Sequence, residues 1–407
     1  MKKKLALVVQ RYGNDIVGGA EWLSKTTAEN LHKKLGWDIH VFTTTAQDYV
    51  TWRGSYVEGE ETIEGITVKR FRPFWFRSQL IFNGLSKIIL PALRVLNKTW
   101  ILRKLSWPLE RLWLWAQGPY CPNLINELIA KEKEYDSILF MTYLYYPTII
   151  GLPKIQKKTI LIPTAHHEAP FYFHHSRRLL NSADLVLANT QKEKELICST
   201  FPTIEPKCKV AGIGLDLPEI IKSQHNEKYI LYLGRISEGK GVHQLIKWFN
   251  EYKETTHTSL KLVLAGKHDG SVKIPSTPYI SYKGQVSEEE KYKLMANAKG
   301  LVNPSAMESL SIIVIEAMYL EIPVLVNGES PVLEEYASLN PSVFSYFNSN
   351  QFKSHLKAID SSKWSESTTK DLLESKLWAK EHFSWDKILP IYQKEVSPNG
   401  ERSLISS

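Results

Sequence analysis

The chain has 407 residues, more than one ordinary hydrophobic core holds, so we expect two or more domains. Its 43% hydrophobic and 23% charged residues are typical of a soluble globular protein. The formal charge of +8 favours an anionic partner: a phosphorylated substrate, a membrane surface or nucleic acid. The lack of zinc-finger, RNP and helix-turn-helix signatures argues against nucleic acid. Three cysteines without a CxxC pair argue against a disulfide framework or a zinc site and favour a reducing compartment.

The N-terminus resembles a signal peptide only superficially. Its basic residues precede an apolar run, but that run extends only from Leu5 to Val9 and is followed at once by Gln10 and Arg11. We therefore expect a first β-strand there. No stretch reaches the length of uncharged apolar sequence that a membrane-spanning helix needs. We expect a cytoplasmic protein, either free or peripheral on the inner face of the membrane.

The first half of the chain alternates strand and helix patterns. A helical period covers residues 18–35, and short buried strands with crossover helices are typical of a parallel sheet. The expected strands are LALVV, DIHVFTTT, SILFMTY, KTILIPTA and DLVLANT.

A polar stretch at residues 217–228 predicts an interdomain linker, after which the alternation restarts. The second set of strands is YILYLGR, LKLVLAG, YISYKG, GLVNPS and IPVLVNG. We therefore expect two Rossmann-like α/β domains, at residues 1–216 and 229–385, facing across a cleft at their strand ends, with a helix and tail at 386–407.

Residues 71–120 interrupt the alternation with a helical segment rich in Trp, Leu and Ile and free of Asp. Lys87, Arg94 and Lys98 share one helical face, Pro91 is expected to kink that helix, and Pro108 is expected to begin the next one. Two readings of the insertion near 77–115 remain open: a helical pair packed on the N-terminal domain, or a basic amphipathic surface for an anionic membrane or lipid-linked acceptor.

The most informative motif is NPSAMESLSIIVIEAM, at residues 303–318. Glu308 is predicted in a loop, with Ser309 or Ser311 as N-cap of a helix whose N-terminus could bind a diphosphate. Because a carboxylate there would repel phosphate, Glu308 should face a neutral sugar. Glu316 falls within an apolar helix and needs partners: ribose hydroxyls would serve, and so would a nearby Lys or Arg.

A second motif, YLGRISEGKG, places two cations in a glycine-bearing loop at a strand end. Arg235 and Lys240 suit a diphosphate, and Gly234 allows a close backbone approach. The loop is not a Walker A motif, because the preceding Gly and the Ser or Thr after Lys are missing.

The N-terminal half contributes two further candidate sites. Gly18 and Gly19 allow a ligand to approach a helix start, but this turn is not GxGxxG, and no acidic residue ends the second strand, which argues against a nicotinamide dehydrogenase. His166 and His167 follow another strand, before Glu168. Adjacent histidines on an extended chain point apart, so a shared metal ion is disfavoured. No Asp-x-Asp pair occurs, so we expect no metal.

Together these motifs resemble the retaining, GT-B-fold family-4 glycosyltransferases (group 1 type). ESLSIIVIEA resembles their E-x7-E motif, GRISEGKG their Arg…Lys donor loop, and VGGAE their first turn. ANTQKEKEL, VAGIGLD and the terminal SWDKILPIY helix, which crosses back to the N-terminal domain in the family, also match. The resemblance covers most of the chain except roughly residues 77–115.

The resemblance implies a role for each residue. Arg235 and Lys240 would hold the diphosphate, Glu316 the ribose, Glu308 the sugar, and His166 its hydroxyl end. The N-terminal domain would be on the acceptor side and the C-terminal domain would bind the donor.

The chain departs from the family pattern in two places. Leu310–Ser311 replaces the usual Phe-Gly after the first acid, and we expect the backbone N–H of Ser311 to keep the phosphate contact beside Ser309. His167 stands where relatives often have an acid, and nothing in the sequence explains that change.

The implied reaction is transfer of a hexosyl-type sugar from a nucleotide-sugar to a glycan or lipid-linked acceptor, with retention of configuration, in cell-surface polysaccharide or glycolipid synthesis. No cofactor is expected. Two cations and a helix N-terminus would stabilise the leaving diphosphate. The alternatives are a GT-B-fold epimerase or phosphorylase, or a membrane-associated, non-catalytic protein that binds a sugar nucleotide.

Overall fold

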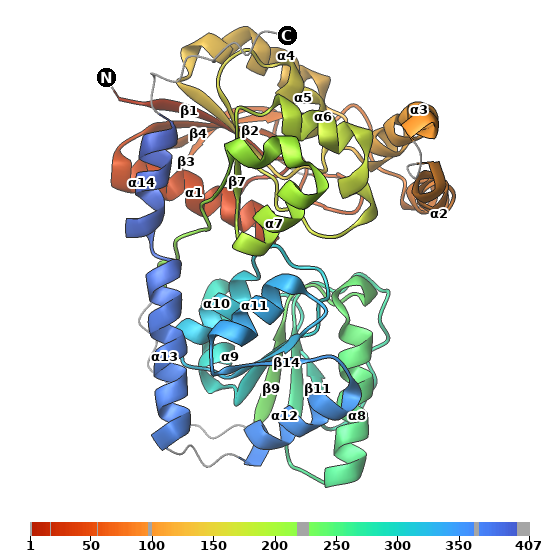
Figure 1. The fold of residues 1–407 in the computed structure, drawn as a ribbon, viewed down its shortest axis with the longest axis vertical. Helices are drawn as coiled ribbons and strands as arrows, with labels where there is room; N and C mark the ends of the chain where they lie inside the picture. Colours follow the sequence, from red (N-terminus) through yellow and green to blue (C-terminus); the bar gives the residue numbers. More distant parts are fainter. Residues whose placement is uncertain are drawn as a thin grey trace. The chain divides into compact units, whose positions relative to one another are not determined.

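The computed structural model describes residues 2–16, 18–54, 56–96, 100–217, 228–361 and 366–396, the side chains of 94–105 and 366–368 excepted. The chain forms two compact units, one made of Met1–Ile213 with Ile388–Ser407 and the other of Gly214–Lys387 (Figure 1). The predicted basic residue Lys98 lies outside the described residues. So does the predicted linker at 217–228, except for its first and last residues.

The N-terminal unit is built on an eight-stranded sheet with the order β3-β4-β2-β1-β5-β6-β7-β8. Every pair is parallel except β3–β4, a hairpin that forms one edge. The strands are β1 (Lys4–Val8), β2 (Asp38–Thr44), β3 (Gly59–Ile63), β4 (Ile66–Phe71), β5 (Ser137–Met141), β6 (Thr159–Ile162), β7 (Leu185–Ala188) and β8 (Cys208–Val210).

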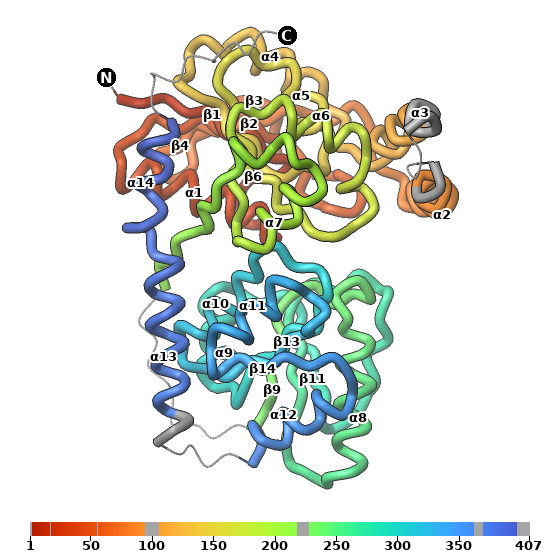
Figure 2. Tube along the Cα trace, in the orientation of Figure 1, coloured from red at the N-terminus to blue at the C-terminus, as the bar shows by residue number. Residues whose placement is uncertain are grey.

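The helices of this unit connect and flank its parallel strands (Figure 2). They are α1 (Gly19–Leu35), α2 (Gln79–Leu96), α3 (Trp100–Gln117), α4 (Pro122–Lys131), α5 (Tyr146–Gly151), α6 (His174–Ser182) and α7 (Gln191–Thr200). The last helix, α14 (Trp385–Glu395), returns to this unit, where Tyr392 is buried.

The C-terminal unit is a six-stranded, wholly parallel sheet with the order β11-β10-β9-β12-β13-β14. Its strands are β9 (Tyr229–Leu233), β10 (Lys261–Ala265), β11 (Ile280–Tyr282), β12 (Gly300–Asn303), β13 (Val324–Asn327) and β14 (Val343–Tyr346). Its helices are α8 (Val242–Thr256), α9 (Glu288–Asn297), α10 (Ile312–Tyr319), α11 (Pro331–Leu339), α12 (Ser349–Ser361) and α13 (Glu366–His382).

Local sequence explains both sheets. Every residue of β5, β6, β7, β9, β12 and β13 is buried, as expected for strands covered on both faces. Helix starts follow the capping rules: Ser287 accepts the N–H of Glu290 at α9, and Thr190 accepts that of Glu193 at α7. The predicted fold class, two parallel α/β sheets with a C-terminal helix returning to the N-terminal domain, is confirmed.

The prediction that Pro108 begins a helix is wrong. Helix α3 begins at Trp100 and contains Pro108, just as α2 contains Pro91. Both prolines are exposed, so water can hydrate the carbonyl that each one deprives of an N–H partner. None of the described helices is long and apolar enough to cross a membrane.

Candidate functional site

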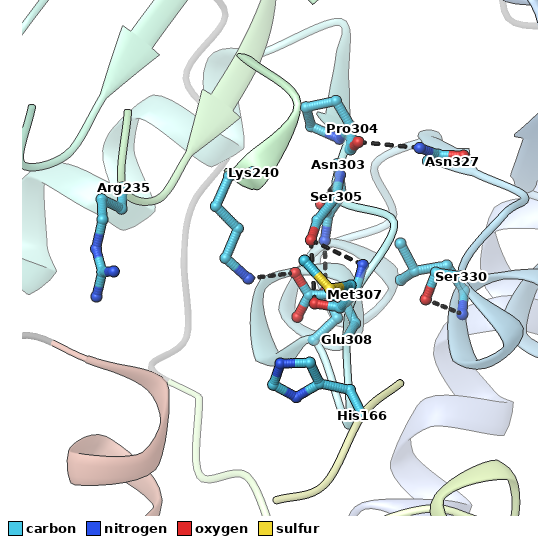
Figure 3. A network of polar contacts seen from close by, with 12 residues as sticks. His166, Arg235, Lys240, Asn303, Pro304, Ser305, Met307, Glu308, Asn327 and Ser330 are labelled. Carbon is cyan, nitrogen blue, oxygen red and sulfur yellow. Dashed lines mark hydrogen bonds and ion pairs between the residues drawn. The ribbon is translucent and has the colours of Figure 1, made fainter. Parts of the chain in front are cut away.

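The loop at residues 304–311, which we call the Glu308 loop, joins β12 to α10 and is held by its own polar contacts (Figure 3). Asn303 accepts the backbone N–H of Ser305 at 3.0 Å and donates from Nδ2 to Ser311 Oγ at 2.8 Å. Asn327, at the end of the neighbouring β13, donates to the carbonyl of Pro304 at 3.1 Å. The loop is therefore fixed from the ends of two adjacent strands.

Glu308 forms an ion pair with Lys240 within this unit. The Lys240 Nζ to Glu308 Oε1 distance is 2.7 Å, and the side chains are 38% and 14% exposed, respectively (Figure 3). An incoming diphosphate would compete with Glu308 for this ammonium group. The structure thus brings two of the predicted site residues together.

Lys240 closes a turn whose backbone needs glycine. Gly241 has φ of 72°, and a Cβ there would lie 2.4 Å from the carbonyl oxygen of Pro304 in the Glu308 loop. At the start of the same segment Gly234 has φ of 145°, and both it and Arg235 are exposed at the end of β9. The two predicted cations therefore lie on one loop, and its glycine lets Lys240 approach the Glu308 loop.

Ser311 occupies the predicted N-cap position of α10, but the predicted capping bond is absent. Its φ of 57° and ψ of 70° are left-handed, its side chain makes no cap bond, and its Oγ accepts from Asn303 instead. The first N–H groups of a helix lack intrahelical acceptors, so this end of α10 keeps its capacity to bind an anion. Leu310 is buried, with its carbonyl bonded to Tyr336, and Ser309 lies between Glu308 and Leu310.

Glu316 is completely buried in α10 and paired with a lysine. Oε1 accepts from Lys291 Nζ and from Tyr292 Oη, both at 2.9 Å, whereas Oε2 has no hydrogen-bond partner among the described residues. Burial raises the pKa of Glu316 against the opposing effect of Lys291. The sequence left two kinds of partner open for Glu316, ribose hydroxyls or a basic side chain. The structure contains the basic side chain, Lys291, and Glu316 Oε2 remains available to a further donor.

In the N-terminal unit, His166 lies in the segment after β6. Its Nε2 is 3.3 Å from Glu168 Oε1, which also accepts from Tyr143 Oη at 2.5 Å. Burial raises the pKa of Tyr143 well above its usual value, so the phenol stays protonated and donates. Thr164, just before the histidine, has φ of 53°, an uncommon conformation for a β-branched residue. His167 contacts Tyr172 through Nδ1.

Glu193 connects the segment after β6 with the segment after β7. Its Oε1 accepts the backbone N–H of Ala165 at 2.5 Å, and its Oε2 accepts the backbone and side-chain N–H groups of Asn189 at 2.7 and 2.9 Å. Burial raises the pKa of Glu193 to about 7, although these three donors act to lower it. The carboxyl therefore anchors the residue directly before His166.

Gly18 and Gly19 lie at the start of α1, as predicted. A Cβ at Gly18 would lie 2.2 Å from Glu21 Oε2, whereas one at Gly19 would meet nothing within 4 Å. Glu21 is buried, and its Oε1 accepts from Arg11 Nη2 at 2.7 Å and from Gln10 at 2.9 Å. Gly18 therefore packs against the buried ion pair of Arg11 and Glu21.

Sequence reasoning missed several of these residues. Lys291 and Tyr292 lie outside every motif, and Asn303 and Glu193 lie within motifs that gave them no role, because each acts through a contact formed only by folding. The one available signal was the Thr190-x-x-Glu193 spacing of a capping box, although Glu193 reaches Asn189 instead of the N-cap residue. Within the described part of the chain, no three His, Cys, Asp or Glu side chains are grouped to hold a metal ion.

Comparison with known proteins finds a family match within the C-terminal unit. Residues 216–361, which contain Arg235, Lys240, Glu308 and Glu316, match the family described as glycosyl transferases group 1. An uncharacterized glycosyltransferase of Methanocaldococcus jannaschii is 29% identical over 171 residues, which are 37% of this chain and 43% of that protein. The chain thus matches less than half of that relative's length.

Solved structures share the whole fold. Sucrose-phosphate synthase from Thermosynechococcus elongatus superposes with a TM-score of 0.67 at 15% identity, over 97% of this chain and 98% of that one. Anabaena HepE, in complex with UDP and glucose, gives a TM-score of 0.65 at 16% identity, over 97% and 100%. The C-terminal unit therefore matches the glycosyl transferases group 1 family over residues 216–361, and the two-sheet architecture of the chain is the GT-B fold.

Proposed function

We propose that this protein is a retaining glycosyltransferase that moves a hexosyl sugar from a nucleotide-sugar donor to an acceptor hydroxyl. The observation that carries the proposal is the Lys240–Glu308 ion pair in the loop that leads into α10. The same helix holds Glu316, whose Oε2 has no hydrogen-bond partner among the residues that the structure describes. A cation, a helix N-terminus and a spare buried acceptor suit a diphosphate joined to a ribose.

In this proposal, Arg235 and Lys240 bind the diphosphate, with the N–H groups near Ser309, Leu310 and Ser311. The bond between the anomeric carbon and the diphosphate oxygen breaks, and a bond to the acceptor oxygen forms on the same face. The acceptor proton passes to a phosphate oxygen. Since negative charge on the departing diphosphate grows in the transition state, fixed cations lower the barrier.

The remaining residues have the following proposed roles. When diphosphate engages Lys240, Glu308 is released to face the sugar, where positive character develops. Glu316 Oε2 accepts a ribose hydroxyl. HepE has been solved with UDP-glucose, which makes UDP-glucose the first donor to test here.

For the acceptor we propose a glycan or lipid-linked sugar, in polysaccharide or glycolipid synthesis at the cytoplasmic face of a membrane. The support is the basic, aromatic segment at residues 71–120, which would face a membrane or an anionic acceptor.

A thermal-shift screen against UDP-, GDP- and ADP-sugars, followed by product analysis, tests the proposal. We expect one donor to raise the melting temperature and to be hydrolysed slowly without acceptor. The variant Lys240→Ala should lose the shift, whereas Lys273→Ala, a lysine of the same unit outside the Glu308 loop, should keep it. Release of an epimerised sugar without transfer, or binding with no turnover on any acceptor, would contradict the proposal.

A further inference from the structure

The outer surface of α3 carries an aromatic groove. Trp107, Pro108, Arg111, Leu112 and Trp115 line an open cavity of about 520 Å³. Their spacing, at i, i+1, i+4, i+5 and i+8, places them along one side of the helix. Trp107, Leu112 and Trp115 are 43%, 42% and 45% exposed, and Arg111 is exposed between the two indoles. We call this surface the α3 groove.

A buried polar chain fixes the first indole of the groove. Trp107 Nε1 donates to His175 Nε2 at 3.0 Å, and His175 Nδ1 contacts Glu110 Oε2 at 3.0 Å. Because an indole N–H can only donate, Nε2 is the acceptor and the histidine proton is on Nδ1. His175 is 4% exposed and Glu110 is completely buried. Such a chain orients a surface tryptophan that would otherwise be free to rotate.

Both carboxylate oxygens of Glu110 accept hydrogen bonds from the start of α6. Its Oε1 also accepts the backbone N–H of His174 at 3.0 Å, and its Oε2 that of His175 at 3.2 Å. Burial acts to raise the pKa of Glu110, but these hydrogen bonds outweigh it and lower the pKa. The carboxylate therefore stays ionised inside the unit and places no negative charge on the groove.

The sequence segment that contains the groove is strongly basic. Residues 71–120 hold eight basic residues and one acidic residue, Glu110, so this segment accounts for +7 of the chain's formal +8. Helix α6 packs against α3, with the ring of His174 5.3 Å from that of Trp107, and adds the exposed Arg177 and Arg178. Exposed indoles beside Arg111, Arg177 and Arg178, with the single carboxylate of residues 71–120 buried, are complementary to an anionic lipid surface.

We propose that the α3 groove binds the surface of an anionic phospholipid bilayer. Arg111, with Arg177 and Arg178, contacts lipid phosphates, while Leu112 and the two indoles enter the boundary between headgroups and acyl chains. Tryptophan favours this depth because its ring is apolar and its N–H is polar. The inference gives the proposed membrane location a specific surface, and it does not depend on glycosyl transfer.

The test is co-sedimentation of the whole protein with vesicles, without any nucleotide-sugar. We expect binding to equimolar phosphatidylcholine and phosphatidylglycerol, and little binding to phosphatidylcholine alone. One basic side chain at such a surface typically contributes about fivefold to the partition coefficient, so Arg111→Gln should lower it about fivefold. Leu112→Ser should lower it at high salt as well, where the electrostatic attraction is screened.

Matched variants serve as controls. Lys133→Gln removes an exposed cation of the same unit outside the groove, and Leu339→Ser removes a leucine that is 53% exposed elsewhere; both should bind as wild type. Melting curves verify that each variant is folded. Three results would overturn the inference: equal binding to neutral vesicles, unchanged binding of Arg111→Gln and Leu112→Ser, or displacement by inorganic phosphate, which would make the groove a site for a soluble anion.

Discussion

Replacement of Glu193 by glutamine should change the pH dependence of stability. The pKa of Glu193 is raised by burial from 4.5 to about 7. Between these values the folded protein binds more protons than the unfolded chain, so this residue's contribution is full below pH 4.5 and is lost as the pH rises through 7. The quantity to compare is the unfolding free energy of wild type minus that of Glu193→Gln. Linkage predicts that this difference falls by about 2.5 kcal/mol from about pH 5 to about pH 8.

Urea unfolding followed by tryptophan fluorescence measures this difference, since eight of the twelve tryptophans precede residue 120. Subtracting the curve of Glu193→Gln from that of wild type cancels every other titrating group. Glu195→Gln is the matched control on the same helix: the pKa of Glu195 is lowered from 4.5 by its hydrogen bond from Lys192, so this carboxyl is ionised in both states from pH 5 to pH 8 and the corresponding difference should be nearly flat there, with a slope of opposite sign only below pH 4.5. A difference that is flat, or that rises from pH 5 to pH 8, would refute the assignment of a raised pKa to Glu193.

The remaining predictions concern the proposed reaction. Arg235→Ala and Lys240→Ala should each lower turnover roughly a hundredfold, from the loss of about 3 kcal/mol of charge stabilisation; turnover within about threefold of wild type would remove them from the site. Glu316→Gln should weaken donor binding in calorimetry and leave the saturated rate nearly unchanged, because ribose barely alters during transfer. Glu308→Gln should lower the saturated rate without weakening donor binding, since the carboxylate competes with diphosphate for Lys240; the reverse pattern in these two variants would reject the assigned roles. Activity should persist in excess chelator, and a loss that manganese restores would show a metal requirement.

The fold could be predicted from sequence because local and global signals agree. Short apolar runs at regular spacing, each followed by a helical period, specify parallel strands with crossover helices, and these became the buried centres of both sheets. The hairpin β3–β4 was missed, because its outer strand GEETI is exposed and carries no apolar alternation. The predicted start of α3 was wrong, because Pro108 prefers the first turn of a helix but lies inside α3. Packing of α3 on α2, where Trp113 donates to Ser86, outweighs that local preference.

The candidate site was only partly predictable. Lys240 and Glu308 carry motifs, and the structure pairs them. The partner of Glu316 comes from α9, 25 residues earlier in the chain, where nothing marks Lys291 among several neighbouring lysines. Contacts of this kind depend on how helices pack over a sheet, and a motif spacing cannot encode them. The same holds for Trp107 and His175, which are 68 residues apart.

The return of α14 gives the chain an interrupted layout. The C-terminal unit, Gly214–Lys387, lies wholly between two pieces of the N-terminal unit. Its ends are adjacent, because the N–H of Leu215 donates to the carbonyl of Phe383 at 2.8 Å, and Gly212 and Ile388 are likewise neighbours in the N-terminal unit. In genetic terms the chain is one domain inserted into another. Residues 214–387 can thus be expressed as a continuous segment, whereas the N-terminal unit requires 213 to be spliced to 388, and a stop codon after 213 would remove the helix that covers it.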